Sequence, residues 1–121
     1  MPIVDIEIVL KAGETLRAEW AAGLAEELGS IFASPPAGTW IKVRGLPSGQ
    51  YAEIGGAPDG VYPIFVRVIK SKLPSLEEMQ IEVGRITGSV AQICGRPSAN
   101  VHIIYEPEAK GRVAFGGKIV L

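Results

Sequence analysis

The second half of this sequence repeats the order of landmarks in the first half, and this repeat restricts the fold more than any other feature. A shift of 61 residues aligns the opening MPIVDIEIVL with YPIFVRVIKSK. Residues of the same kind recur in the same order over the whole unit, so the similarity of the two halves is not due to chance. We expect a single domain over residues 1–121, with repeat units 1–56 and 63–117 and a turn-rich linker at 57–62. The aligned pairs are Pro2 with Pro63, Ile3 with Ile64, Ile8 with Ile69, Lys11 with Lys72, Gly23 with Gly84, Pro36 with Pro97, and Gly55-Gly56 with Gly116-Gly117.

Each unit has the periodicity of a strand, a helix and a second strand. Residues 3–10 alternate in polarity, and residues 64–69 are apolar on both faces, as in a buried central strand. Apolar residues at helical spacing predict one helix over 14–32 and another after the capping-box sequence Ser75-Leu76-Glu77-Glu78. Gly84 and Gly88 inside the second helix indicate a close approach to the sheet. The second strands are expected at 40–43 and 101–105.

Two such units joined by right-handed crossovers predict an α/β fold of the α+β type, a four-stranded sheet with two helices on one face. The other face of the sheet then stays uncovered. Because residues 64–69 are apolar on both sides, we expect a large apolar patch on that face. Such a patch indicates a closed homo-oligomer, although the periodicity does not give the number of subunits.

Composition excludes several classes of function. A net charge of -1 provides no basic surface for nucleic acid. The longest uncharged run, residues 28–41, is too short for a membrane span. The opening residues do not resemble a signal peptide, so we expect no export. The single cysteine, Cys94, is typical of a reducing compartment, so we expect a cytoplasmic protein with neither nucleic-acid nor membrane partners.

The opening Met-Pro-Ile, followed by a strand, a helix, a second strand and a Gly-Gly ending, resembles the tautomerase superfamily. The second unit is the clearer match. Its stretch from Val101-His102-Ile103-Ile104 through Ala109-Lys110-Gly111 to Gly116-Gly117 is similar to the 4-oxalocrotonate tautomerase pattern. The two-unit length is similar to fused members such as macrophage migration inhibitory factor and malonate semialdehyde decarboxylase. The resemblance implies a homotrimer with a barrel-like assembly, catalysis by an amino-terminal proline, and no cofactor or metal.

Pro2 is the candidate catalytic residue. Once Met1 is removed, Pro2 carries a secondary amine whose charged form is disfavoured in a partly apolar pocket near cations. Such an amine can act as a general base near neutral pH and interconvert the enol and keto forms of a small 2-oxo acid. The alternative is a strand that merely begins with proline.

Four further residues are candidates for binding a small carboxylate or enol substrate. Lys70 and Lys72 end the strand at 64–69, where fused family members keep a basic pair; the alternative is two solvated lysines. His102 falls where relatives have a substrate-binding side chain, although a lone strand histidine is more often packed or exposed. Arg67 lies in an apolar strand and needs a partner or a cavity.

Several family positions differ in this chain, and alternatives stay open. The acid that activates water in the decarboxylase would fall near Gly38, and none is present there. This difference favours isomerisation over the addition of water by a hydratase or dehalogenase on the same scaffold. A third possibility is a non-catalytic trimeric module with a vestigial pocket, since a Pro2 that retains Met1 is an amide and has no basic nitrogen.

Overall fold

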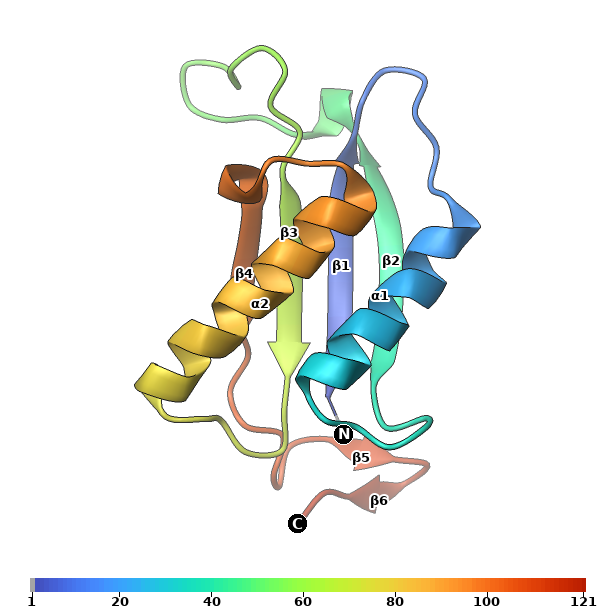
Figure 1. Ribbon diagram of the computed structural model, residues 1–121, viewed down its shortest axis with the longest axis vertical. Helices are drawn as coiled ribbons and strands as arrows, with labels where there is room; N and C mark the ends of the chain where they lie inside the picture. The colour runs from blue at the N-terminus through green and yellow to red at the C-terminus, as the bar shows by residue number, and fades with distance from the viewer. Residues whose placement is uncertain (1) are drawn as a thin grey trace.

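The structure is a computed structural model that describes residues 2–121. Its centre is a four-stranded sheet in the order β2-β1-β3-β4, and two helices cover one face of it (Figure 1). The expected α+β fold with two β-α-β units is confirmed. The strands are β1 (Ile3–Leu10), β2 (Trp40–Pro47), β3 (Ile64–Ile69) and β4 (Val101–Tyr105), and the helices are α1 (Ala18–Ile31) and α2 (Leu76–Cys94). Short 3-10 helices, η1 (Ser48–Gln50) and η2 (Ser98–Asn100), and a hairpin of β5 (Ala114–Phe115) and β6 (Lys118–Ile119) complete the described chain.

The register of the sheet determines which chain ends meet. Within each unit the strands are parallel, whereas β1 and β3 pair antiparallel, with Ile3 opposite Ile69 and Ile8 opposite Ile64. An antiparallel pair places the start of one strand beside the end of the other. Pro2, which precedes β1, is therefore next to the segment that leaves β3 at Lys70.

The core lies between the helices and one face of the sheet. Alternate residues of β1 and β3 point into it, and the apolar sides of both helices cover them, as the period-2 and period-3.6 patterns require. Burial of each large side chain contributes roughly 1.5–3 kcal/mol. The fully buried side chains include Val4, Ile6, Ile8, Leu24, Leu28, Ile64, Val66, Val68, Ile86 and Val90.

Burial shows that the two units match with a shift of 62 residues, so the alignment by 61 is wrong by one. Ile3 would match Ile64 in that alignment, yet Ile64 is fully buried whereas Ile3 points to the opposite face from its neighbour Val4. A shift of 62 instead matches residues that share the core: Val4 with Val66, Ile6 with Val68, Leu24 with Ile86, and Leu28 with Val90.

The helix ends support the same shift. The backbone N–H of Ser34 donates to the Gly29 carbonyl, and 62 residues later the N–H of Arg96 donates to the Ala91 carbonyl. Ala33 and Gly95, which precede these donors, both have positive φ. The structural counterpart of Pro2 is thus Ile64, and Pro63 lies one position earlier.

Two helix predictions need correction. The helix α1 begins at Ala18, four residues later than expected, because the carboxylate of Glu14 bonds the backbone N–H of Lys11 and the side chain of Arg96 in the preceding loop. The close approach inferred from Gly84 and Gly88 is wrong, since an added Cβ would meet no atom within 4 Å at either position. The capping box at α2 is confirmed: Ser75 Oγ accepts from the Glu78 N–H at 3.2 Å and donates to its carboxylate at 2.8 Å.

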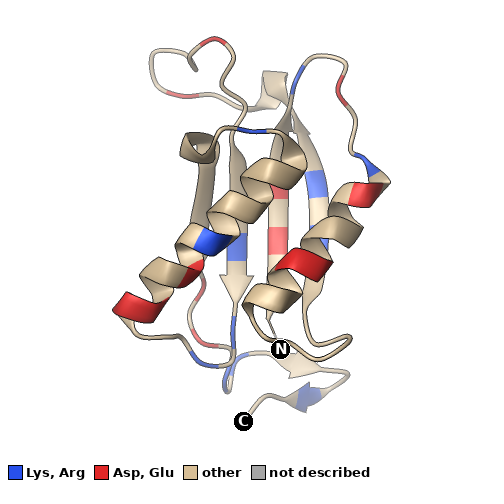
Figure 2. Ribbon diagram, in the orientation of Figure 1, with Lys and Arg blue, Asp and Glu red and all other residues tan. Residues whose placement is uncertain are grey.

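The face of the sheet that carries no helix is less apolar than expected. Acidic residues of β1 alternate with apolar ones and lie between basic residues of β2 and β3 (Figure 2). Ion pairs cross this face, and they interrupt the apolar surface formed by residues such as Trp40 and Ile104. The pairs are Asp5–Lys42 at 3.1 Å, Glu7–Arg44 at 3.2 Å and Arg67–Glu106 at 2.8 Å. Among the described residues, no helix is long and apolar enough to span a membrane.

Candidate functional site

Three of the five predicted site residues line one cleft. Pro2 is buried, and its carbonyl accepts a hydrogen bond of 3.0 Å from the backbone N–H of Trp40, which holds it against β2. Lys70 and Lys72 reach the same place because β3 ends beside the start of β1. Met1, whose removal the resemblance implies, lies outside the described residues. The cleft has a volume of about 220 Å³ and is lined by Pro2, Phe32, Ala33, Ser34, Pro35, Lys70, Ser71 and Lys72.

A second, apolar hollow of about 340 Å³ adjoins Pro2. Its wall is the pair Trp40 and Phe115, whose rings meet edge to face with centroids 5.0 Å apart. The hairpin β5–β6 carries Phe115, and the turn of this hairpin is Gly116-Gly117, where both residues have positive φ. Sequence analysis missed this aromatic wall.

The two lysines of the cleft have different surroundings. The Nζ atom of Lys70 lies 2.9 Å from Oε2 of Glu82, and this pair is largely buried, with side chains 19% and 14% exposed. Tyr105 donates its hydroxyl to Oε1 of the same Glu82 at 2.5 Å. Burial, together with this hydrogen bond to Glu82, raises the pKa of the Tyr105 hydroxyl well above its ordinary value. Lys72 is exposed at the mouth of the cleft.

The other two predicted residues lie outside this cleft, on the uncovered face of the sheet. His102 is exposed, and its ring centroid is 5.6 Å from that of Phe65 on the neighbouring strand. Arg67 contacts Glu106 and lines a separate hollow with Tyr51 and Phe65. Neither residue lines the two hollows at Pro2 within this chain.

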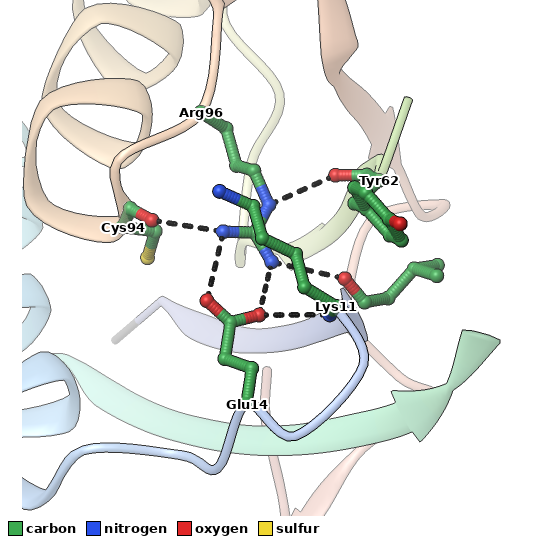
Figure 3. A network of polar contacts seen from close by, with 6 residues as sticks. Lys11, Glu14, Tyr62, Cys94 and Arg96 are labelled. Carbon is green, nitrogen blue, oxygen red and sulfur yellow. Dashed lines mark hydrogen bonds and ion pairs between the residues drawn. The ribbon is translucent and has the colours of Figure 1, made fainter. Parts of the chain in front are cut away.

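The opposite end of the sheet is closed by Arg96, a residue that sequence analysis did not select (Figure 3). Its guanidinium is buried and donates to the carbonyls of Val9, Tyr62 and Cys94 as well as to the carboxylate of Glu14. With the shift of 62, Arg96 occupies the position that Ser34 has at the Pro2 cleft. The second unit therefore has a filled site where the first has an open one.

Cys94 belongs to this closed end. Burial raises the pKa of its thiol to about 11, so the thiol stays protonated at neutral pH. Cys94 is thus a core residue at the end of α2, directly before the helix-ending Gly95. Within residues 2–121 no three acidic, histidine or cysteine side chains gather in a way that could hold a metal ion.

Replacing Glu14 should reveal a pH-dependent contribution to stability. The hydrogen bond from Arg96 holds the pKa of Glu14 below its ordinary value of 4.5. A carboxyl with a depressed folded-state pKa stabilises the protein above its unfolded pKa, and this contribution disappears as the pH falls through the folded value. We expect Glu14→Gln to be less stable than wild type at pH 7, with the difference shrinking below about pH 4.5. Urea unfolding at several pH values measures it, with the exposed Glu27→Gln as the control; a difference independent of pH would contradict the expectation.

Known structures with the same architecture were found, whereas no protein-family model and no curated protein sequence matches the chain. Pt0534 inactivated by 2-oxo-3-pentynoate is 17% identical with a TM-score of 0.77, and the match covers 98% of this chain and 94% of the Pt0534 chain. A fused 4-OT, F6, described as a wild-type asymmetric trimer, is 11% identical with a TM-score of 0.78. The match covers 97% of this chain and 94% of the F6 chain. The macrophage migration inhibitory factor of Trichinella spiralis is 12% identical with a TM-score of 0.74, and the match covers 97% of this chain and 98% of that protein. The chain has the fold of the tautomerase superfamily, to which these proteins belong.

Proposed function

We propose that this protein is a cofactor-independent tautomerase that interconverts the enol and keto forms of a small 2-oxo acid, with Pro2 as the general base after Met1 is removed. One observation carries the proposal: Pro2 lies between a cleft with two lysines and a hollow with an aromatic wall. Such a site suits a substrate that has a carboxylate at one end and an apolar group at the other.

The chemistry needs only groups of this chain. The pyrrolidine nitrogen takes a proton from the carbon next to the ketone, and the electrons of that C–H bond form the C=C bond of an enolate. The proton then returns to the enolate oxygen and gives the enol; the reverse order gives the ketone. Burial and the neighbouring lysines disfavour the protonated amine, which keeps the base available near neutral pH. Lys72 binds the carboxylate, and Lys70 adds positive charge where the enolate develops.

Isomerisation fits the lining better than the addition of water does. A hydratase or dehalogenase needs an acid or base that activates a water molecule beside the substrate. The described residues that line the two hollows at Pro2 include no carboxylate and no histidine. Glu82 is nearby, but its carboxylate is engaged by Lys70 and Tyr105.

Covalent labelling tests the proposal directly. 2-Oxo-3-pentynoate inactivates Pt0534, whose fold this chain has. We expect one adduct per chain on protein that lacks Met1, located at Pro2 by peptide mapping, and no Pro2 adduct on protein that retains Met1. Enol-to-keto turnover of phenylenolpyruvate and 2-hydroxymuconate by the unlabelled sample should accompany it. Protein that lacks Met1, is not labelled at Pro2 and turns over neither compound would instead be the non-catalytic module.

We propose a homotrimer as the functional assembly. Large apolar side chains are exposed on the uncovered face of the sheet, including Trp40 at 52% and Ile104 at 41%, and the fused 4-OT of the same fold is a trimer. Light scattering should give three times the 12.8-kDa chain mass at micromolar concentration. Ile104→Asp should shift the mass toward the monomer, whereas the exposed Glu27→Gln should not. A monomeric wild type would contradict the assembly.

A further inference from the structure

The cluster of Lys70, Glu82 and Tyr105 beside the Pro2 cleft has no polar counterpart in the first unit. The shift of 62 matches these three residues with Ile8, Trp20 and Val43, all of which contribute to the apolar core. The same packing position is therefore filled by apolar side chains in one unit and by an ion pair with a tyrosine in the other.

Stability does not explain the polar version. Taking two charges out of water costs free energy, and replacing a buried ion pair by apolar residues of similar size is often neutral or stabilising. The first unit shows that this fold can fill the equivalent position with apolar side chains alone. A polar cluster kept at the open site, where its lysine lines the cleft, points to a role in that site.

The contacts of Lys70 define that role. Its ammonium is held by two groups: the carboxylate of Glu82, with Oε2 at 2.9 Å and Oε1 at 3.3 Å, and the ring of Phe32, whose centroid is 5.1 Å away. Tyr105 donates to Glu82 from β4 and fixes the orientation of the carboxylate. Two other charged residues of α2, Glu78 and Arg85, share a neighbouring groove with Lys70 but form no hydrogen bond or ion pair with it.

We propose that Glu82 and Tyr105 are positioning residues: together they hold the Lys70 ammonium on the wall of the Pro2 cleft, and the charge of Glu82 offsets that of Lys70 in the electric field in which the Pro2 amine works. This inference rests on the proposed function. The charged groups that face Pro2 along the cleft are Lys70 and Lys72, and the apolar hollow supplies none among its described lining residues. Because Glu82 offsets the charge of Lys70, Lys72 is the cation left to bind a substrate carboxylate.

The test is a charge cycle read by the titration of the Pro2 amine, followed by NMR of protein labelled with ¹⁵N-proline and lacking Met1. Glu82→Gln removes a negative charge and should lower the pKa of the amine by about 0.5–1 unit. Lys70→Met leaves Glu82 uncompensated and should raise it by a similar amount. The double variant should return the pKa close to wild type, because the net charge is restored, and should keep the thermal midpoint. The exposed Glu77→Gln, on the same helix, is the matched control and should change nothing.

Tyr105→Phe separates orientation from charge. It preserves every charge, so the amine should titrate as in wild type, whereas kcat should fall several-fold with KM nearly unchanged. Equal amine pKa values in wild type, Glu82→Gln and Lys70→Met would overturn the inference, as would a double variant that unfolds. The titration needs no substrate, so a wild type without turnover or labelling would refute the proposed function while the charge cycle still decides the role of the cluster.

Discussion

Arg96→Ala should lower the free energy of unfolding by about 3–5 kcal/mol, the usual effect of removing one partner of a buried charge pair. The Arg96 side chain is 2% exposed and lies 2.6 Å from Glu14. Its loss leaves the Glu14 carboxylate without its main partner and removes one hydrogen bond from each of three backbone carbonyls. Urea unfolding at pH 7 measures the change. The thermal midpoint should fall by about 10 °C or more, because 1 kcal/mol corresponds to roughly 3 °C or more in a domain of this size.

Two controls define what Arg96 contributes. Arg112→Ala removes the same side chain from an exposed loop, so its effect should stay within about 0.5 kcal/mol. Arg96→Lys keeps the charge but lacks the planar group with five N–H donors, and most of the loss should remain. If Arg96→Ala destabilises the protein no more than Arg112→Ala does, the network of Figure 3 contributes little.

Short-range patterns predicted the fold well because the strands and helices depend on periodicity within a few residues. The alternation over 3–10, the apolar run at 64–69 and the capping box at Ser75 all correspond to observed elements. An alignment of the two units by identical residues, such as Pro2 with Pro63, is shifted by one residue. It ignores which face of the sheet each side chain points to. The alternation of buried and exposed residues along each strand is the better guide to the alignment, because a slip of one residue moves every side chain to the other face.

The site was predicted in part for a similar reason. Pro2, Lys70 and Lys72 come together because antiparallel pairing of the first strands of the two units places one start beside the other end. The sequence itself indicates that His102 lies elsewhere. Its strand neighbours Val101 and Ile103 point into the core, so His102 points to the opposite face of the sheet.

Contacts between distant residues left no periodic signal. Glu14 and Arg96 meet although they are 82 positions apart. Tyr105 reaches Glu82 across 23 positions. Only the three-dimensional packing of the two units brings such residues together, and neither pair has a spacing that sets it apart from solvated charges on a helix or loop.

The largest effect on activity should come from the chemistry of the nitrogen of Pro2. Protein that retains Met1 has an amide there, with no usable lone pair, so turnover should fall by the 10²–10⁴-fold that a general base typically contributes. Pro2→Ala without Met1 keeps a primary amine in nearly the same place. It should fold, retain weak activity and show a shifted pH profile. The kcat and KM of the three forms, measured over a range of pH on one enol substrate, test this order.

Pro63 is the internal control, because it is also a buried proline directly before a strand of the same sheet. Its nitrogen is a tertiary amide bonded to Tyr62, and its end of the sheet is closed by Arg96, which donates to the Tyr62 carbonyl. Pro63→Ala should therefore leave the pH dependence of turnover unchanged and alter stability at most. A chain with one reactive proline then carries one active site, at the open end. Activity that is equally insensitive to replacement of Pro2 and of Pro63, or that persists fully with Met1 attached, would mean that proline at position 2 only begins a strand.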